Sequence, residues 1–271
     1  MSELKKFQVQ TARPLPVIVL ADTSGSMSVD GKIEALNKGL KDMISSFAGE
    51  SRLRAELQVS LITFGGSQAE LNLPLTPAHQ LQGFTPLVAE GMTPLGGALS
   101  LACDMIEDKD CIPSRAYKPV IVLASDGYPN DDWQGPFARL INGERSSKAT
   151  RFAMAIGADA DEAMLGAFAN DPEAPLFRAE NAGDIYRFFR AVTMSVSARS
   201  QSATPNQSTP LQIPSSDDQD WEFWCACWQA GLRCGALLIF WTAHRIRMPC
   251  ASAASQAGGA LLWLTDWAAA R

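Results

Sequence analysis

The sequence predicts an α/β fold, an open and mostly parallel sheet with helices on both of its faces. Through the first 195 residues, apolar runs rich in β-branched residues alternate with segments whose apolar residues recur at helical spacing. The two strongest apolar runs show no polar alternation, which is typical of strands buried on both faces. An aspartate closes each of them, Asp22 after the first and Asp126 after the second.

The first half of this region reads as strand, helix and strand. Residues 15–21, LPVIVLA, predict a buried strand, and residues 56–64, ELQVSLITF, predict a second one that a Gly-Gly pair ends. Between them, one apolar face predicts a helix, formed by Ile33, Leu36, Leu40, Met43, Ile44 and Phe47.

The second half continues the alternation. Thr93 and Pro94 open a predicted helix that runs to about residue 106, with the proline in its first turn. Further along, we expect strands at 117–124 and 151–156, a helix at 161–169 and a closing helix around 185–192. Right-handed crossovers between such strands give a parallel sheet that binds its ligand beyond the carboxyl ends of the strands. Asp22 and Asp126 would therefore face one crevice.

Composition divides the chain into four parts. Of 271 residues, 46% are hydrophobic and 19% are charged, which excludes disorder over most of the length. With 23 Lys+Arg against 29 Asp+Glu and no basic run, nucleic acid is not an expected partner. We predict an N-terminal extension at 1–9, the α/β domain at 10–197, a disordered Ser-, Gln-, Thr- and Pro-rich linker at 198–220 and a Trp- and Cys-rich tail at 221–271.

The N-terminal residues and the C-terminal tail bear on two further questions, the location of the protein in the cell and a second metal site. No apolar stretch follows Lys5 and Lys6, so we expect no secretory signal and a cytoplasmic protein. The longest apolar run of the tail, 234–243, is too short for a transmembrane segment. A Zn²⁺ site in the tail is an open but disfavoured alternative. Its ligands would be Cys225, Cys227, Cys234 and Cys250, but the spacing of these cysteines departs from the paired C-x-x-C motifs of zinc sites.

Residues with oxygen ligands gather in three segments at predicted strand ends or helix starts, and they are Asp22, Ser24, Ser26, Thr93 and Asp126. Residues two apart in an extended loop point the same way, so the first three can converge. Carboxylates and hydroxyls favour Mg²⁺, Mn²⁺ or Ca²⁺ over Zn²⁺. The alternative is a helix N-cap and turn at residues 22–26; for Thr93, capping and metal ligation are compatible.

These three segments, DTSGS, Thr93 and Ser-Asp-Gly, resemble the metal-ion-dependent adhesion site of von Willebrand factor A domains, which have a Rossmann-like, doubly wound sheet. The resemblance implies that Ser24 and Ser26 are direct ligands and that Thr93 is one in the liganded state. It also implies that Asp22 and Asp126 act through ordered waters. The ion would then have a position left for an acidic side chain of another protein.

Over roughly residues 13–200, the sequence resembles one group of von Willebrand factor A domain proteins in particular. PVIVLADTSGSM, GMTPLGGAL, VIVLASDGYPNDDW and the closing FFRAVTMSVSA are similar to TerY-like proteins of bacterial tellurium-resistance and stress-response loci. That group implies a cytoplasmic adaptor, not an enzyme, beside a protein kinase and a PP2C-type phosphatase. A metal-dependent phosphohydrolase is the main alternative, disfavoured because Ser24 stands where such enzymes place a second carboxylate. A structural scaffold that does not use its ion is a further alternative.

Four other residues are considered as functional candidates, and three of them have two interpretations each. Asp131 and Asp132 are expected to be solvated turn residues, or else part of an acidic rim or second ion site. Trp133 is either a partner anchor or a core residue. Cys103 lies on the apolar stripe of its predicted helix and is expected to pack in the core.

Overall fold

A computed structural model describes residues 12–50, 54–170, 176–207, 209, 211 and 213. The chain divides into two units, Met1–Ser215 and Ser216–Arg271, and every described residue belongs to the first. The predicted extension at 1–9 and the tail at 221–271, with its zinc alternative, lie outside the described residues. Among the helices that are described, none combines the length and apolar character needed to cross a bilayer.

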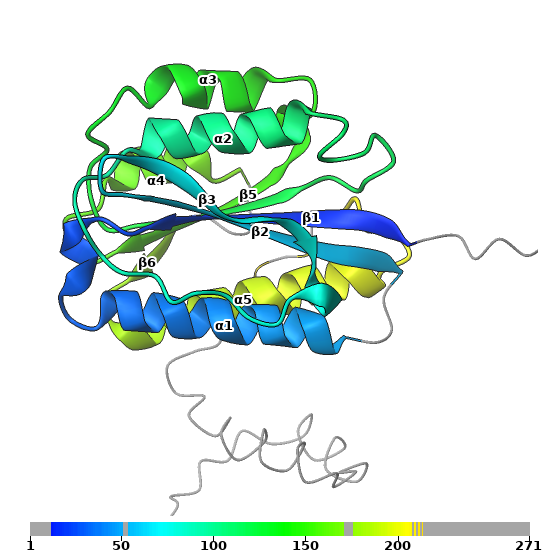
Figure 1. Cartoon of the computed structure of the whole chain (residues 1–271), viewed down its shortest axis with the longest axis horizontal. Helices are drawn as coiled ribbons and strands as arrows, with labels where there is room; N and C mark the ends of the chain where they lie inside the picture. Colours follow the sequence, from blue (N-terminus) through cyan, green and yellow to red (C-terminus); the bar gives the residue numbers. More distant parts are fainter. Residues whose placement is uncertain are drawn as a thin grey trace, which may run out of the picture. The chain divides into compact units, whose positions relative to one another are not determined.

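The fold is the predicted α/β architecture, built on a six-stranded sheet of order β3-β2-β1-β4-β5-β6 (Figure 1). Neighbouring strands pair in parallel, except that β3 runs antiparallel to β2 at one edge. The strands are β1 (Arg13–Asp22), β2 (Ala55–Gly65), β3 (Gln68–Pro77), β4 (Val120–Ser125), β5 (Thr150–Ile156) and β6 (Phe177–Ala179).

In the part of the chain that the structure describes, five helices cover the sheet in two layers (Figure 1). On one face lie α1 (Lys32–Gly49) and α5 (Ala182–Gln201); on the other lie α2 (Leu95–Glu107), α3 (Gln134–Asn142) and α4 (Glu162–Phe168). Short 3₁₀ turns are η1 (Gly25–Ser28), η2 (Ala78–Gln80) and η3 (Ser146–Lys148).

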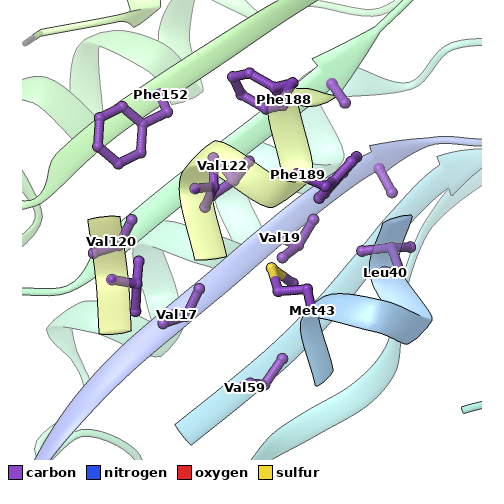
Figure 2. Close-up of a cluster of buried hydrophobic side chains, with 14 of the residues drawn as sticks. Val17, Val19, Leu40, Met43, Val59, Val120, Val122, Phe152, Phe188 and Phe189 are labelled. Atoms are coloured by element: carbon purple, nitrogen blue, oxygen red, sulfur yellow. The ribbon is translucent and has the colours of Figure 1, made fainter. Parts of the chain in front are cut away.

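Alternate residues of β1 belong to two separate cores. Val17 and Val19 pack with α1 and α5, whereas Ile18 and Leu20 pack on the opposite side with α2. Figure 2 shows the first core, where strand valines face Met43 of α1 and the phenylalanines of α5. Because both faces of β1 are buried, its apolar run shows no polar alternation.

The predicted apolar face of α1 is confirmed, since all six of its positions are buried. Gly39 on the same face allows α5 to approach closely, because a Cβ there would lie 2.9 Å from Cδ2 of Phe189. The close contact between these helices completes the core on this side of the sheet.

The structure differs from the sequence-based expectation in three elements that were not predicted, β3, β6 and α3, and in the end of α5. Strand β3 was not expected; it is an edge strand whose side chains are all exposed or half-exposed, and it contains Pro74, which cannot donate a backbone hydrogen bond. Helix α5 continues to Gln201, so the predicted linker start at residue 198 falls inside it. The continuation is held by Arg199, which is buried and donates to the backbone carbonyls of Lys118, at 2.7 Å, and Pro205.

Candidate metal centre

The candidate site lies where the order of the strands reverses. From β1 the chain builds β2 and β3 outward on one side and then places β4 on the other side of β1. In doubly wound sheets the crevice beyond such a pair of strands is the usual ligand site. Asp22 is the last residue of β1, and Asp126 directly follows β4. Ala21 and Ala124 pair in register, so the two strands end side by side.

The carboxylate of Asp22 is fully buried and held at both oxygens. Its Oδ1 accepts a hydrogen bond from the backbone N–H of Ser24 at 2.8 Å, and its Oδ2 accepts one from the hydroxyl of Ser125 at 2.5 Å. These contacts bend the loop after β1 back toward the end of β4. Asp22 therefore fixes the position of the loop that carries both candidate serines.

The hydroxyls of Ser24 and Ser26 converge on Asp126. The two Oγ atoms lie 3.0 Å apart, and Ser26 Oγ donates to Asp126 Oδ1 at 2.6 Å. Ser24 Oγ lies 3.5 Å from the same carboxylate oxygen. Ser24 precedes η1 but makes no side-chain capping bond, so its hydroxyl does not serve the predicted N-cap alternative. Three oxygen ligands from two strand ends thus meet at one place.

Backbone hydrogen bonds bring the second segment against this loop. Gly25 N–H donates to the carbonyl of Gly91 at 3.0 Å, and Met92 N–H donates to the carbonyl of Gly66 at 2.9 Å. Gly91 has φ of +69°, and a Cβ there would lie 2.4 Å from Cα of Gly66. Only glycine fits this crossing, which places Thr93 next to the first loop.

Asn130 holds Thr93 against the third segment. The side-chain Oδ1 of Asn130 accepts a hydrogen bond from the backbone N–H of Thr93 at 3.0 Å, and the backbone N–H of Asn130 donates one to the carbonyl of Thr93 at 3.1 Å. A Cβ on Gly127 would lie 3.9 Å from Thr93 Oγ1, so that hydroxyl lies beside the residue that follows Asp126. All five predicted site residues therefore lie on adjoining segments at the ends of β1 and β4 and the start of α2, and four of them are at most 8% exposed, Ser26 being the exposed one.

Two carboxylates in this crevice create a need for positive charge. Burial raises the pKa of Asp22, hydrogen bonds from Ser125 and Ser24 oppose that rise, and the charge of Asp126 adds to it. The ammonium of Lys32, the first residue of α1, lies 2.8 Å from Asp126 Oδ2. Sequence reasoning missed Lys32; the signal was a lysine at the start of a helix, where the helix dipole disfavours a cation.

The donor set fits a hard divalent cation. It consists of two carboxylates and three hydroxyls, and no group of three or more His, Cys, Asp or Glu side chains suited to a metal occurs within the described ranges. Oxygen ligands of this kind suit Mg²⁺, Mn²⁺ or Ca²⁺. Ser24, Ser26 and Thr93 would hold the ion, with Asp22 and Asp126 supplying the negative charge.

Asp131 has a structural role that the sequence reading did not foresee. Its two carboxylate oxygens accept hydrogen bonds from the N–H groups of Gly96, at 2.9 Å, and Gly97, at 3.0 Å, in the first turn of α2. Asp131 is a half-exposed turn residue, as expected, and its carboxylate also caps α2, a role that the sequence did not predict. Asp132 is exposed, as a solvated turn residue would be.

Trp133 and Cys103 belong to the core on the α2 side. Trp133 is partly buried, and its ring centroid lies 5.9 Å from that of Phe137 in α3. This packing favours the core reading of Trp133 over the partner-anchor reading. Cys103 is fully buried, which confirms the expectation of a small core residue.

The comparisons with known proteins agree with this geometry. Residues 17–129, which contain all five candidate site residues, match the family model of the von Willebrand factor type A domain. The chain therefore contains a von Willebrand factor type A domain. A curated relative, the magnesium-chelatase 60 kDa subunit of Rhodobacter capsulatus, is 35% identical over 146 residues. That match covers 52% of this chain and 24% of the relative, so the chain matches about a quarter of the relative's length.

Solved structures share the fold at low identity. A von Willebrand factor type A protein from Catenulispora acidiphila has a TM-score of 0.54 and 20% identity, covering 68% of this chain and 43% of its own. Proximal thread matrix protein 1 of the mussel byssus, in a structure described as having a zinc-occupied MIDAS motif, has a TM-score of 0.53 and 17% identity. That match covers 67% of this chain and 48% of the mussel chain.

Proposed function

We propose that this domain binds another protein through a divalent cation, Mg²⁺ in the first instance. The hydroxyls of Ser24, Ser26 and Thr93 hold the ion, the carboxylates of Asp22 and Asp126 supply negative charge around it, and the ion accepts an acidic side chain of the partner. The observation that carries the proposal is the convergence of Ser24 Oγ and Ser26 Oγ on Asp126 Oδ1. Mn²⁺ or Ca²⁺ would serve through the same oxygens.

The charges of the site favour a carboxylate as the incoming ligand. Neutral hydroxyls leave most of an ion's positive charge uncompensated. A divalent ion together with Lys32 carries three positive charges against the two of Asp22 and Asp126, leaving one positive charge for a partner to neutralise. Without the ion, the same group of residues has no net positive charge to attract an acid. Docking should therefore require the ion.

Exposed apolar side chains on the surrounding loops support a protein as the ligand. Met92, beside Thr93, is 59% exposed, and Tyr128, two residues after Asp126, is 68% exposed. Val29 at the end of η1 and Val88 before Gly91 are 52% and 74% exposed. Apolar and aromatic side chains of this kind are typical of protein interfaces. The expected partner segment carries an Asp or Glu with apolar neighbours.

The cellular setting we propose is a cytoplasmic adaptor of a bacterial tellurium-resistance or stress-response system, with a protein kinase or PP2C-type phosphatase as partner. Its support is the similarity of the stretches around Asp22, Thr93 and Asp126 to TerY-like proteins. The curated relative is itself named a subunit, which fits a domain that works in an assembly.

A binding role fits the site better than phosphohydrolase chemistry. A phosphohydrolase of this architecture would need an acid two residues after the first aspartate to protonate the leaving oxygen, and Ser24 stands there. Both oxygens of Asp22 are also engaged by hydrogen bonds, and its carboxylate is fully buried, which leaves it poorly placed to attack a substrate. A scaffold that never uses its ion is the other alternative.

An array of synthetic peptides tests the proposal. Each peptide carries one Glu between apolar residues and has a twin with Gln in that place; binding is measured in millimolar Mg²⁺ and in chelator. We expect binding of some Glu peptides that is lost with Gln, with chelator and with Ser26→Ala. Peptide binding of equal strength in Mg²⁺ and in chelator would reject the docking role. Turnover of p-nitrophenyl phosphate that Asp22→Asn abolishes would favour the phosphohydrolase instead.

A further inference from the structure

Lys32 is an unusual residue for its position in the fold. It is the first residue of α1, directly after Gly31, whose φ of +69° ends the loop from η1. The N-terminal end of a helix carries partial positive charge, so a cation there is disfavoured. The Lys32 side chain is nevertheless only 16% exposed and turns toward the end of β4. Such a placement calls for a compensating interaction.

That interaction is the ion pair with Asp126. Lys32 Nζ lies 2.8 Å from Asp126 Oδ2, while the other oxygen, Oδ1, faces the hydroxyls of Ser24 and Ser26. The Asp126 side chain is fully buried. A Cβ on Gly157 would lie 3.6 Å from the ammonium, so the end of β5 also borders this position. One carboxylate is thus shared between a fixed internal cation and the candidate ion ligands.

We propose that Lys32 sets the affinity of the centre for its divalent cation, as a tethered positive charge that competes for Asp126. This inference rests on the proposed function, because it concerns the same ion. Two like charges that share one buried carboxylate repel each other strongly where water is scarce. Removing the ammonium should therefore tighten ion binding, while its presence leaves the bound ion more attractive to a partner's carboxylate.

The same contact predicts that removing the Lys32 charge lowers the stability of the ion-free protein, although it raises the affinity for the ion. Asp126 has its Oδ2 paired only if Lys32 is present, and a buried carboxylate that loses its ion-pair partner destabilises the fold. Replacing Lys32 by a neutral residue should therefore lower stability in chelator and raise affinity for Mg²⁺. A merely structural lysine would show the first effect without the second.

The test compares Mg²⁺ affinity, by calorimetry, and the urea midpoint in chelator for the full-length protein and three variants. Lys32→Met removes the charge and keeps an unbranched chain, and Lys32→Arg keeps the charge. Lys38→Met is the matched control, because it removes one lysine from the same helix at an exposed pair with Asp42. We expect Lys32→Met to bind Mg²⁺ at least ten times more tightly than the wild type and to have a lower urea midpoint in chelator. The Mg²⁺ affinities of Lys32→Arg and Lys38→Met should stay within about threefold of the wild-type value.

The outcomes separate this inference from the proposed function. If the wild type binds Mg²⁺ and Lys32→Met binds no tighter, the role of Lys32 is overturned and the metal centre stands. If neither protein binds Mg²⁺, the metal centre and the inference both fall. Measurable binding in Lys32→Met alone would support the inference, since it would show that the ammonium is what weakens the site.

Discussion

Replacing Gly91 by alanine tests how the site is assembled. Gly91 has φ of +69°, a region that costs an alanine about 1–2 kcal/mol. A Cβ would also lie 2.4 Å from Cα of Gly66, whereas carbon atoms pack at about 3.5 Å or more, so the two segments must separate by about 1 Å. That shift would strain the bonds from Gly66 N to Glu90 O, at 2.7 Å, and from Met92 N to Gly66 O, at 2.9 Å. At about 1 kcal/mol for each of these two hydrogen bonds, added to the cost of the positive φ, Gly91→Ala should lose about 3–4 kcal/mol of unfolding free energy.

The assay is urea unfolding in chelator, followed by circular dichroism, together with Mg²⁺ calorimetry. We expect the Mg²⁺ affinity of Gly91→Ala to fall at least tenfold, because Thr93 follows two residues later and moves with this crossing. Gly166→Ala is the matched control: it lies in α4, a Cβ there meets no atom within 4 Å, and the change should add about 0.5–1 kcal/mol. Wild-type stability and wild-type ion affinity in Gly91→Ala would refute this reasoning.

Two further predictions concern the fold away from the site. Arg199→Met should lower the unfolding free energy by about 2–4 kcal/mol, since it removes a buried side chain and leaves the carbonyls of Lys118 and Pro205 without this donor. A loss under about 1 kcal/mol in urea unfolding would contradict this. Burial would raise the pKa of Glu107, but hydrogen bonds from Ser146 and Arg145 outweigh it and lower that pKa. The carboxylate therefore stabilises the fold above about pH 4.5, and this contribution is lost as pH falls through the lowered value. Glu107→Gln should show a shallower loss of stability between pH 5 and 3 than the wild type, and equal slopes would count against the hydrogen-bond account.

The parts of the fold that could be predicted from the sequence are those with strong local patterns. The unbroken apolar run of β1 reports burial on both faces, and the spacing of apolar residues in α1 reports one buried face. Asp22 and Asp126 could be placed together because parallel strands end at the same edge of a sheet. The convergence of Ser24 and Ser26 was also predicted, but its premise of an extended loop was wrong, because Ser26 lies in the 3₁₀ turn η1.

Features that depend on distant backbone contacts could not be found in this way. The crossing of Gly91 over Gly66 leaves no side-chain pattern in the sequence. Asp131 caps a helix that begins 36 residues earlier in the chain, so no local motif marks it. The apolar alternation of β3 is present in the sequence at Ala69, Leu71, Leu73 and Leu75, but Pro74 within it and the strand's edge position weaken that signal.

Calorimetric titration of Mg²⁺ into the full-length protein and three serine variants tests the central claim most directly. Ser24→Ala and Ser26→Ala each remove one hydroxyl that meets Asp126. Ser28→Ala removes a hydroxyl from the same loop that donates instead to the carbonyl of Gly25, at 2.7 Å. We predict one Mg²⁺ bound by the wild type and by Ser28→Ala, and at least a tenfold loss of affinity in the other two. Equal affinity in all four proteins would show that these serines do not hold the ion.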